Sequence, residues 1–209
     1  MRGRRHWPAF LLLVGVLVTA LGCSSSGPPA VEEGDIVFQT SRSPQSLAIQ
    51  KATHFVYSHV GLVTFRDAKP YVLEAEATVR LTPLVEWLAR GEGGHYVVKR
   101  LVDAHQVLDT ASQVELQKQM RRFEGAPYDS TFEWSDERLY CSELVWKVYE
   151  RALGIRLGEP QRLRDLDLSV PEVQLKLAQR FGAQVPLDEP VISPQRLFES
   201  ARLATVTER

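Results

Sequence analysis

The stretch RLYCSELVWKVYE, residues 138–150, places a cysteine at the expected start of an amphipathic helix. Leu144 and Val148 recur at helical spacing, and Gly154 is a favourable residue for ending the helix. Counting three residues back from Leu144 puts Cys141 on the same apolar stripe, facing the core or a sheet. The free N–H groups of a first helical turn favour a thiolate and can also bind an oxyanion. The pattern therefore marks Cys141 as a candidate nucleophile.

The first thirty residues predict export. Residues 1–22 combine a basic start with an apolar run that is short for a membrane span, which is typical of a cleaved signal peptide. The sequence ALGC, residues 20–23, resembles a bacterial lipobox with Ala20 in place of the usual leucine. We expect cleavage before Cys23, lipid attachment to Cys23, a tether over residues 23–33 and one domain over residues 34–209. The protein is then an exported lipoprotein, anchored to a membrane on the periplasmic side of a bacterial cell envelope.

Cys23 and Cys141 are the only cysteines in the chain. A lipidated Cys23 cannot form a disulfide, so Cys141 is either an inert buried thiol or a reactive one. The chain has 25 basic and 26 acidic residues, and the expected signal peptide removes only basic ones. This balance does not favour nucleic acid as a partner, nor a membrane contact made by basic residues.

Apolar periodicity and turn residues indicate a mixed α+β domain. Residues 58–65 and 71–79 are rich in β-branched residues and are joined by RDAKP, which predicts a hairpin. Further strands are expected over residues 35–40 and 95–102, and short helices over 46–53 and 83–90. A capping box formed by Ser112 and Glu115 predicts a helix that ends near Glu124.

A thiolate nucleophile needs a histidine with which to exchange its proton, and the histidine needs an orienting partner. His59 lies in the first hairpin strand, and Glu74 and Glu76 lie in the second. A turn at residues 66–67 pairs His59 with Glu74, whereas a turn at residues 67–68 pairs it with Glu76. Periodicity leaves both registers open.

Zinc binding by His54, His59 and Cys141 is a weaker hypothesis, because no second cluster of metal-type residues supports it. We therefore expect neither a metal nor another cofactor.

Several motifs carry a family resemblance. The stretch GAPYDSTFEWSDERLYCSELVW, residues 125–146, resembles the Gly-x-Pro-Tyr … Cys-Ser-x-Leu-Val signature of NlpC-type cell-wall cysteine peptidases. The candidate histidine precedes the cysteine, as in circularly permuted members. Residues 34–63, KPYVLEA (69–75), TPLVEW (82–87), YCSELVWKVYE (140–150) and ISPQRLF (192–198) are similar to the YiiX/YebB group of permuted papain-like hydrolases. The resemblance runs from about Gly34 to Thr205.

The resemblance implies a circularly permuted papain-like (NlpC-type) α+β fold, with an antiparallel sheet packed against the helix that bears the nucleophile. It assigns Cys141, His59 and Glu74 as the catalytic triad, which selects Glu74 over Glu76 and, with it, the register that pairs Glu74 with His59. Tyr128 is a candidate for binding the scissile carbonyl, and Tyr140 is a second candidate substrate contact.

The implied function is that of a cell-envelope cysteine hydrolase that cleaves amide bonds. Cell-wall peptide, and hence peptidoglycan, is the leading substrate. One alternative is a hydrolase or acyltransferase acting on lipid amides or esters, because permuted relatives use the same triad on acyl chains. A second alternative is a non-catalytic envelope-binding lipoprotein.

Overall fold

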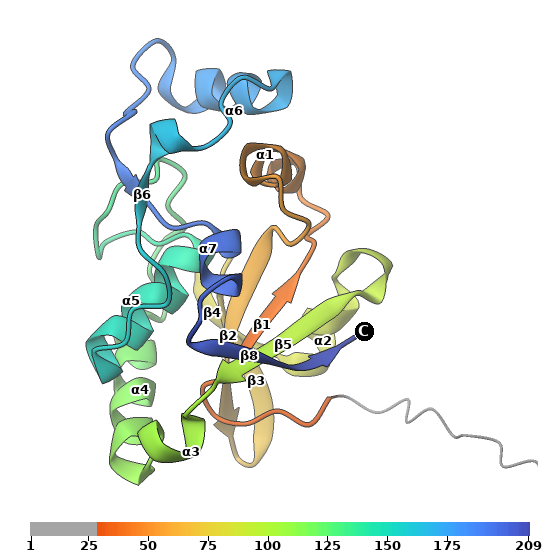
Figure 1. Cartoon of the computed structure of the whole chain (residues 1–209), viewed down its shortest axis with the longest axis vertical. Coiled ribbons are helices and arrows are strands. Elements are labelled where there is room, and N and C mark those ends of the chain that lie inside the picture. The colour runs from red at the N-terminus through yellow and green to blue at the C-terminus, as the bar shows by residue number, and fades with distance from the viewer. Residues whose placement is uncertain (1–28) are drawn as a thin grey trace, which may run out of the picture.

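The computed structural model describes residues 29–209, so the expected signal peptide and Cys23 lie outside the described residues. Its main sheet has six antiparallel strands in the order β4-β3-β2-β1-β5-β8 (Figure 1). A small second sheet pairs β6 with β7. The strands are β1 (Ile36–Gln39), β2 (His59–Arg66), β3 (Lys69–Ala75), β4 (Val79–Pro83), β5 (Tyr96–Leu101), β6 (Gln161–Arg162), β7 (Pro190–Val191) and β8 (Leu203–Glu208).

Helices connect these strands and cover the main sheet. The α-helices are α1 (Pro44–Thr53), α2 (Leu84–Ala89), α3 (Ala104–Val107), α4 (Thr110–Phe123), α5 (Cys141–Leu153), α6 (Pro171–Phe181) and α7 (Pro194–Phe198). Two short 3-10 helices are η1 (Glu92–Gly94) and η2 (Leu163–Asp165). No helix among residues 29–209 combines the length and the apolar character needed to cross a membrane.

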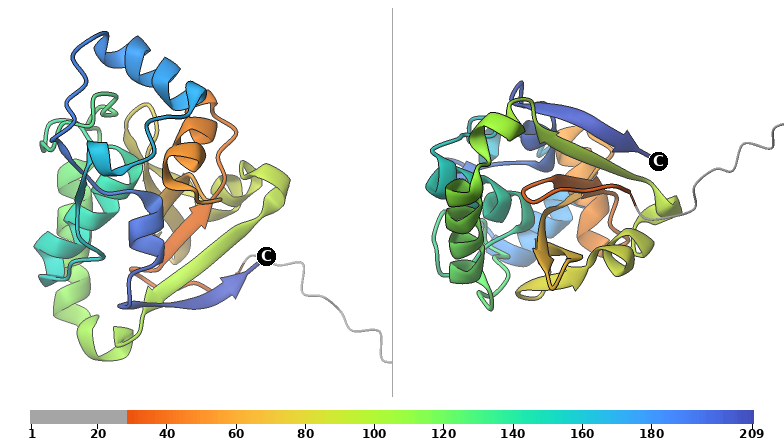
Figure 2. Two further views of the ribbon diagram at one scale, coloured as in Figure 1. Left: turned by 45° about the horizontal axis from the view of Figure 1, so that its top comes forward. Right: turned by 90° about the horizontal axis from the view of Figure 1, so that it is seen from below.

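The sheet lies between a thick helical layer and a thin one. Ile36 and Phe38 point to the main core, which they share with α4 and α5, whereas Val37 points to the opposite face. On that face α2 packs through Trp87, which is completely buried. Figure 2 shows the sheet between α2 and the α4–α5 pair. Because α5 packs directly on β2 and β3, the expected contact between the sheet and the cysteine-bearing helix is confirmed.

A third, smaller cluster lies at one end of the molecule, where α1 packs against α6 (Figure 1). Its core is made by small and branched apolar side chains, which are Ala48, Ala52, Leu163, Val173, Leu177 and Val191. These residues come from distant parts of the sequence, and they enclose space at the N-terminal end of α5.

The register of the β2–β3 hairpin differs from the one that the choice of Glu74 implied. Arg66 pairs with Lys69 and Leu62 pairs with Leu73, so the turn residues are Asp67 and Ala68. Both turn residues have positive φ, at 50° and 59°, as a two-residue hairpin turn of type I′ requires. The alternative register would place Pro70, which has no N–H, opposite the buried Val63. Strand hydrogen bonding therefore decides the register, although alanine is poorly suited to positive φ.

Two predicted boundaries were also wrong. The strand expected over residues 71–79 is two strands, because β3 ends at Ala75 and the chain turns back into β4 at Val79. Helix α4 starts at Thr110, before the expected capping box, and Asp109 caps it by accepting a hydrogen bond from the N–H of Ser112 at 2.8 Å.

Candidate active site

Cys141 is the first residue of α5, at the end of the helix that meets the sheet. The residues beside it fasten this helix end to the segment around Ile192. The hydroxyl of Tyr140 accepts a hydrogen bond from the N–H of Ile192 at 2.9 Å, and the hydroxyl of Ser142 donates to its carbonyl at 2.7 Å. Glu143 accepts a hydrogen bond from the N–H of Tyr140 at 3.4 Å. Cys141 is therefore held firmly, and only 5% of its surface is exposed.

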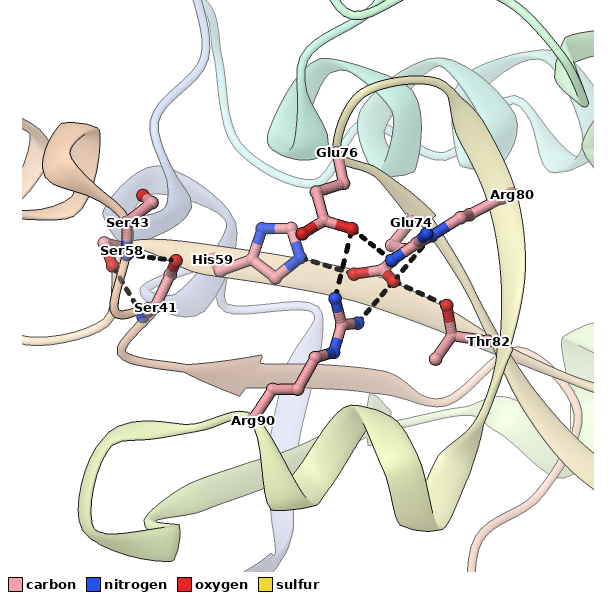
Figure 3. Close-up of polar contacts among 9 residues, drawn as sticks. All are labelled: Ser41, Ser43, Ser58, His59, Glu74, Glu76, Arg80, Thr82 and Arg90. Carbon is pink, nitrogen blue, oxygen red and sulfur yellow. Dashed lines mark hydrogen bonds and ion pairs between the residues drawn. The ribbon is translucent and has the colours of Figure 1, made fainter.

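His59 opens β2 and is oriented by a carboxylate and an aromatic ring. Its Nε2 lies 2.8 Å from Oε2 of Glu74. Figure 3 shows the two side chains pointing towards each other. Its ring stacks on Trp87 of α2 with centroids 5.7 Å apart. Packing on one side and a charge-assisted hydrogen bond on the other leave the imidazole little freedom to rotate.

Glu74 is completely buried and is surrounded by donors. The hydroxyl of Thr82 donates to its Oε1 at 2.6 Å, and Arg90 binds the same oxygen. Nε of Arg80 lies 3.5 Å from this oxygen. Glu76 is half exposed and pairs with Arg80 and Arg90, with no bond to His59 (Figure 3). Of the two glutamates considered from the sequence, Glu74 is the one that contacts His59, and the sequence did not predict the contacts of Thr82 and Arg90 with it.

His59 and Glu74 meet diagonally across the β2–β3 ladder. Continuing the ladder from the Leu62–Leu73 pair places Gly61 directly opposite Glu74, and His59 is two residues away on the same face. A methyl group on Gly61 would lie 2.2 Å from Cγ1 of Val72 and 3.7 Å from Cβ of Glu74. The missing side chain of Gly61 thus leaves room for Glu74 to lean towards His59.

Gly61→Ala is therefore expected to destabilise the protein by about 2 kcal/mol and to lower turnover, because a buried clash shifts β3 and with it Glu74. Thermal unfolding and activity measure the two effects. Gly94→Ala is a control for destabilisation without a clash, because no atom lies within 4 Å of the added methyl group but φ is +71°, so the variant should lose stability through backbone strain and keep its turnover. An alanine at position 61 that leaves both the unfolding temperature and the turnover unchanged would contradict this role of Gly61.

Charge interactions shift all three groups towards an ion pair. Burial alone would raise the pKa of the Cys141 thiol, but His59 and the backbone N–H groups of Val60 and Ser142 lower it below its usual value. Burial alone would lower the pKa of His59, but Cys141 and Glu74 raise it to about 9. Burial also disfavours the Glu74 carboxylate, yet His59, Thr82 and Arg90 lower its pKa to about 2. The site is thus arranged to hold a thiolate, an imidazolium and a carboxylate near neutral pH.

This arrangement predicts a pH profile for alkylation of Cys141 by iodoacetamide. The thiolate is the reactive species, so the rate should rise with pH through a midpoint below the ordinary thiol value of about 8.5. Turnover should fall again as pH rises through about 9, where His59 loses the proton that a leaving group needs. An alkylation midpoint at the ordinary thiol value would contradict the ion pair. In His59→Ala the midpoint should move upwards.

Tyr128 is held beside Cys141 by a short chain of hydrogen bonds. Arg180 can only donate, and it donates to Oε1 of Gln45 at 2.5 Å. The amide nitrogen of Gln45 therefore faces Tyr128 and donates to its hydroxyl oxygen at 2.7 Å. The Tyr128 proton must then point elsewhere, and no acceptor for it is found among residues 29–209. Burial and the charge of Cys141 raise the pKa of Tyr128, so its hydroxyl stays protonated.

Two hollows meet at Cys141. The apolar pocket, of about 80 Å³, lies between α1, α6 and the start of α5. Besides Cys141, Tyr128 and Tyr140, most of its wall is aliphatic or aromatic and includes Ala48, Ile49, Ala52, Phe132, Leu163, Leu166, Leu168, Val173, Leu177, Val191, Ile192 and Pro194. The polar side chains at its wall are Gln45, Thr53, Ser142, Lys176, Arg180 and Ser193. The polar groove runs past His59 on the other side, and its wall includes Gln39, Arg42, Gln45, Glu76, Arg90, Lys176 and Arg180. Cys141 and Tyr128 line both hollows.

The structure brings Cys141, His59, Glu74, Tyr128 and Tyr140 to one site but leaves His54 outside it. His54 is largely exposed and pairs with Asp167 at 2.9 Å. Residues 29–209 contain no group of three or more His, Cys, Asp or Glu side chains that could hold a metal ion.

Comparison with known proteins agrees with this architecture. Residues 30–207 match the family of permuted papain-like amidase enzymes, YaeF/YiiX, C92 family. The chain belongs to this family. It is therefore a cysteine hydrolase of the amidase type, which favours the enzymatic interpretation over a non-catalytic binding lipoprotein.

Two relatives have similar sequences or structures. The uncharacterized protein YiiX of Escherichia coli strain K12 is 51% identical over 177 residues, which cover 85% of this chain and 86% of the relative. The crystal structure of metalloprotein YiiX from Escherichia coli O157:H7 is similar with a TM-score of 0.82 and 51% identity, covering 85% of this chain and 97% of that one.

Proposed function

We propose that this hydrolase cleaves an amide or ester bond whose acyl side is apolar, with Cys141 as nucleophile, His59 as base and acid, and Glu74 as the residue that orients His59. The observation that carries the proposal is the apolar pocket beside Cys141. A substrate whose carbonyl carbon lies at the sulfur can place its acyl chain in this pocket, where burial of each CH2 contributes about 0.8 kcal/mol.

In the proposed reaction the Cys141 thiolate attacks the carbonyl carbon, and a C–S bond forms. The imidazolium of His59 gives its proton to the leaving nitrogen or oxygen as the bond to carbon breaks. Water then attacks the thioester, His59 takes its proton, and the C–S bond breaks to release the acid. Glu74 keeps the imidazole in one orientation and stabilises its charged form.

Attack by the thiolate places a negative charge on the carbonyl oxygen of the substrate, and hydrogen-bond donors are needed to stabilise it. The first-turn N–H of Cys141 has no partner within the helix, because the residue lies at the start of α5. Gln45 donates to the hydroxyl oxygen of Tyr128, so the hydroxyl proton of Tyr128 points away from Gln45. We take this O–H group as the second donor to the oxyanion. We assign these two groups to the oxyanion site. Tyr140 forms part of the wall that contacts the acyl chain.

The size of the pocket leads to a test with a series of acyl chains. At about 80 Å³ it is smaller than the cavity of about 150 Å³ that accommodates benzene in an engineered protein. We expect kcat/KM for N-acyl amides to rise from acetyl towards about four carbons, which places about three beyond the carbonyl in the pocket, and then to level off or fall. The expected products are the free acid and the amine, read by mass. Ala52→Leu, which fills the pocket, should shift the optimum to shorter chains. Rates that do not depend on chain length would overturn the proposal.

Cell-wall peptide remains a second candidate substrate, because the polar groove carries charges of both signs that suit a peptide with charged groups. Incubation with peptidoglycan fragments distinguishes the two proposals. If fragments are cleaved at rates above those of the best N-acyl amide, the acyl proposal fails and the peptide proposal stands.

The proposed location is the bacterial cell envelope, supported by the lipobox-like ALGC sequence. Cys23→Ser is expected to abolish lipid labelling and to move the protein out of the membrane fraction, because the lipid attachment atom is lost. Metabolic labelling with a fatty acid, followed by fractionation, checks this. Unchanged fractionation, with no label on the wild-type protein, would contradict the anchor.

A further inference from the structure

The polar groove contains three cations that lack an acidic partner. Arg42, Lys176 and Arg180 each bind only a neutral oxygen, and within residues 29–209 none of them lies within 4 Å of a carboxylate. Arg42 donates to the carbonyl of Gly91 at 3.4 Å, and Lys176 donates to the amide of Gln179 at 3.3 Å. By contrast, Arg90 and Glu76 in the same groove neutralise each other. The remaining charge of the groove is therefore positive, although the whole chain is slightly acidic.

Arg180 is the most constrained of these cations. It is only partly exposed, it stacks over Phe132 at 4.9 Å, and it donates to Gln45. The nearby carboxylate of Asp129 is completely buried and lies too far away to form an ion pair. A guanidinium that is partly removed from water without a close counter-ion is costly, unless an anion binds to it.

The positions of these cations relate them to the scissile bond. Lys176 and Arg180 are one helical turn apart on α6 and therefore lie on the same face of that helix. Both line the groove and the apolar pocket, as Cys141 does, while Arg42 lines the groove alone. An acyl chain in the pocket leaves the other half of the substrate in the groove, beside these three side chains.

We propose that Arg42, Lys176 and Arg180 form an anion subsite for the leaving half of the substrate. Its ligand is a carboxylate or phosphate group, as in an N-acyl amino acid or an acyl amide of a phosphorylated amine. The natural substrate then has an apolar acyl group on one side of the bond and an anion on the other. This assignment of the substrate class rests on the proposed function, whereas the anion subsite can be tested without it.

The direct test compares two alkylating reagents of similar size. Iodoacetate carries a carboxylate and iodoacetamide is neutral, and both react with the Cys141 thiolate by displacing iodide. The ratio of their rates cancels any change in thiolate reactivity, including a change caused through Gln45 and Tyr128. The ratio is measured in the wild-type protein, in Arg180→Gln, in Lys176→Gln and in Arg121→Gln. Arg121 is an exposed cation of α4 outside the groove, so its variant controls for net charge.

We expect Arg180→Gln to lower the iodoacetate-to-iodoacetamide ratio by about tenfold, as for the loss of one charge-assisted hydrogen bond. Lys176→Gln should lower it by a smaller factor, and Arg121→Gln should leave it at the wild-type value. Arg180→Lys should restore part of the ratio. If the ratio is unchanged in both Arg180→Gln and Lys176→Gln, or falls equally in Arg121→Gln, the subsite is refuted. Because Lys176 is bound only to Gln179, its variant keeps the test valid if Arg180→Gln does not fold.

Substrates with one butanoyl group and three leaving groups identify the anion. The leaving groups are glycine, phosphoethanolamine and the neutral glycinamide. An anion preference of kcat/KM in the wild-type protein that disappears in Arg180→Gln supports the subsite, and the better of the two anionic substrates tells carboxylate from phosphate. Turnover of glycinamide alone refutes the subsite but leaves the acyl proposal standing. If none of the three is cleaved, the acyl proposal fails, and the alkylation ratio still decides the subsite.

Discussion

Cys141→Ala is expected to reduce turnover by about 10⁴-fold or more, because it removes the atom that forms the covalent intermediate. His59→Ala should cost nearly as much, since the thiolate forms at neutral pH mainly through its contact with His59. The double variant should lose little beyond either single variant. A nucleophile and its base act as one unit, so their effects are not additive.

The loss of turnover tests the roles of Cys141 and His59 only if these variants remain folded. Cys141 lies at a helix start where alanine is well tolerated, and the lost packing of one sulfur costs on the order of 1 kcal/mol. Thermal unfolding of all three variants checks this. Cys141→Ser is the matched control, because it keeps an atom of similar position but weak nucleophilicity. A folded Cys141→Ala protein with wild-type turnover would refute the assignment of the nucleophile.

Glu74→Gln is expected to lower turnover by about 100-fold, whereas Glu76→Gln should have a small effect. Glu74 is completely buried and bonds to His59, so its charge supports the imidazolium directly. Glu76 is half exposed and reaches only the two arginines. Glu74→Gln should also destabilise the protein by about 3 kcal/mol, because His59 and Arg90 lose the buried carboxylate that they share, and Arg90 keeps only the half-exposed Glu76.

A pH profile separates a direct effect on His59 from a loss of stability. The Glu74 carboxylate helps to raise the pKa of His59 to about 9, so the alkaline limb of the turnover profile should move to lower pH in Glu74→Gln. A purely structural role for Glu74 would lower turnover without moving this limb. Equal losses in Glu74→Gln and Glu76→Gln, or the reverse order, would show that the orienting carboxylate is not Glu74.

The amino-acid sequence by itself determined the local parts of this protein. The apolar spacing after Cys141 predicted α5, and Gly154 ends that helix with positive φ, because helical periodicity and a left-handed helix end both depend on near neighbours. Alternation in the strands, together with the Cys, His and Glu residues that carry the family resemblance, was enough to identify the fold and the candidate triad. The position of Cys141 at the start of a helix could be predicted without any tertiary contact.

Only the tertiary structure decided which residues meet. The hairpin register depended on keeping Pro70, which has no N–H, out of a hydrogen-bonded position opposite Val63, and this outweighed the poor fit of Ala68 to its turn. Glu74 reaches His59 along a diagonal that Gly61 leaves open, a contact that a search for directly opposed residues does not find.

The apolar pocket and the cations of the groove were not visible in the sequence either. They arise where α1 packs against α6, more than 100 residues later in the chain. The apolar pattern of neither helix predicts which element packs against it, because many surfaces can bury the same apolar stripe equally well. The sequence therefore predicted the candidate nucleophile, and long-range packing decided what surrounds it.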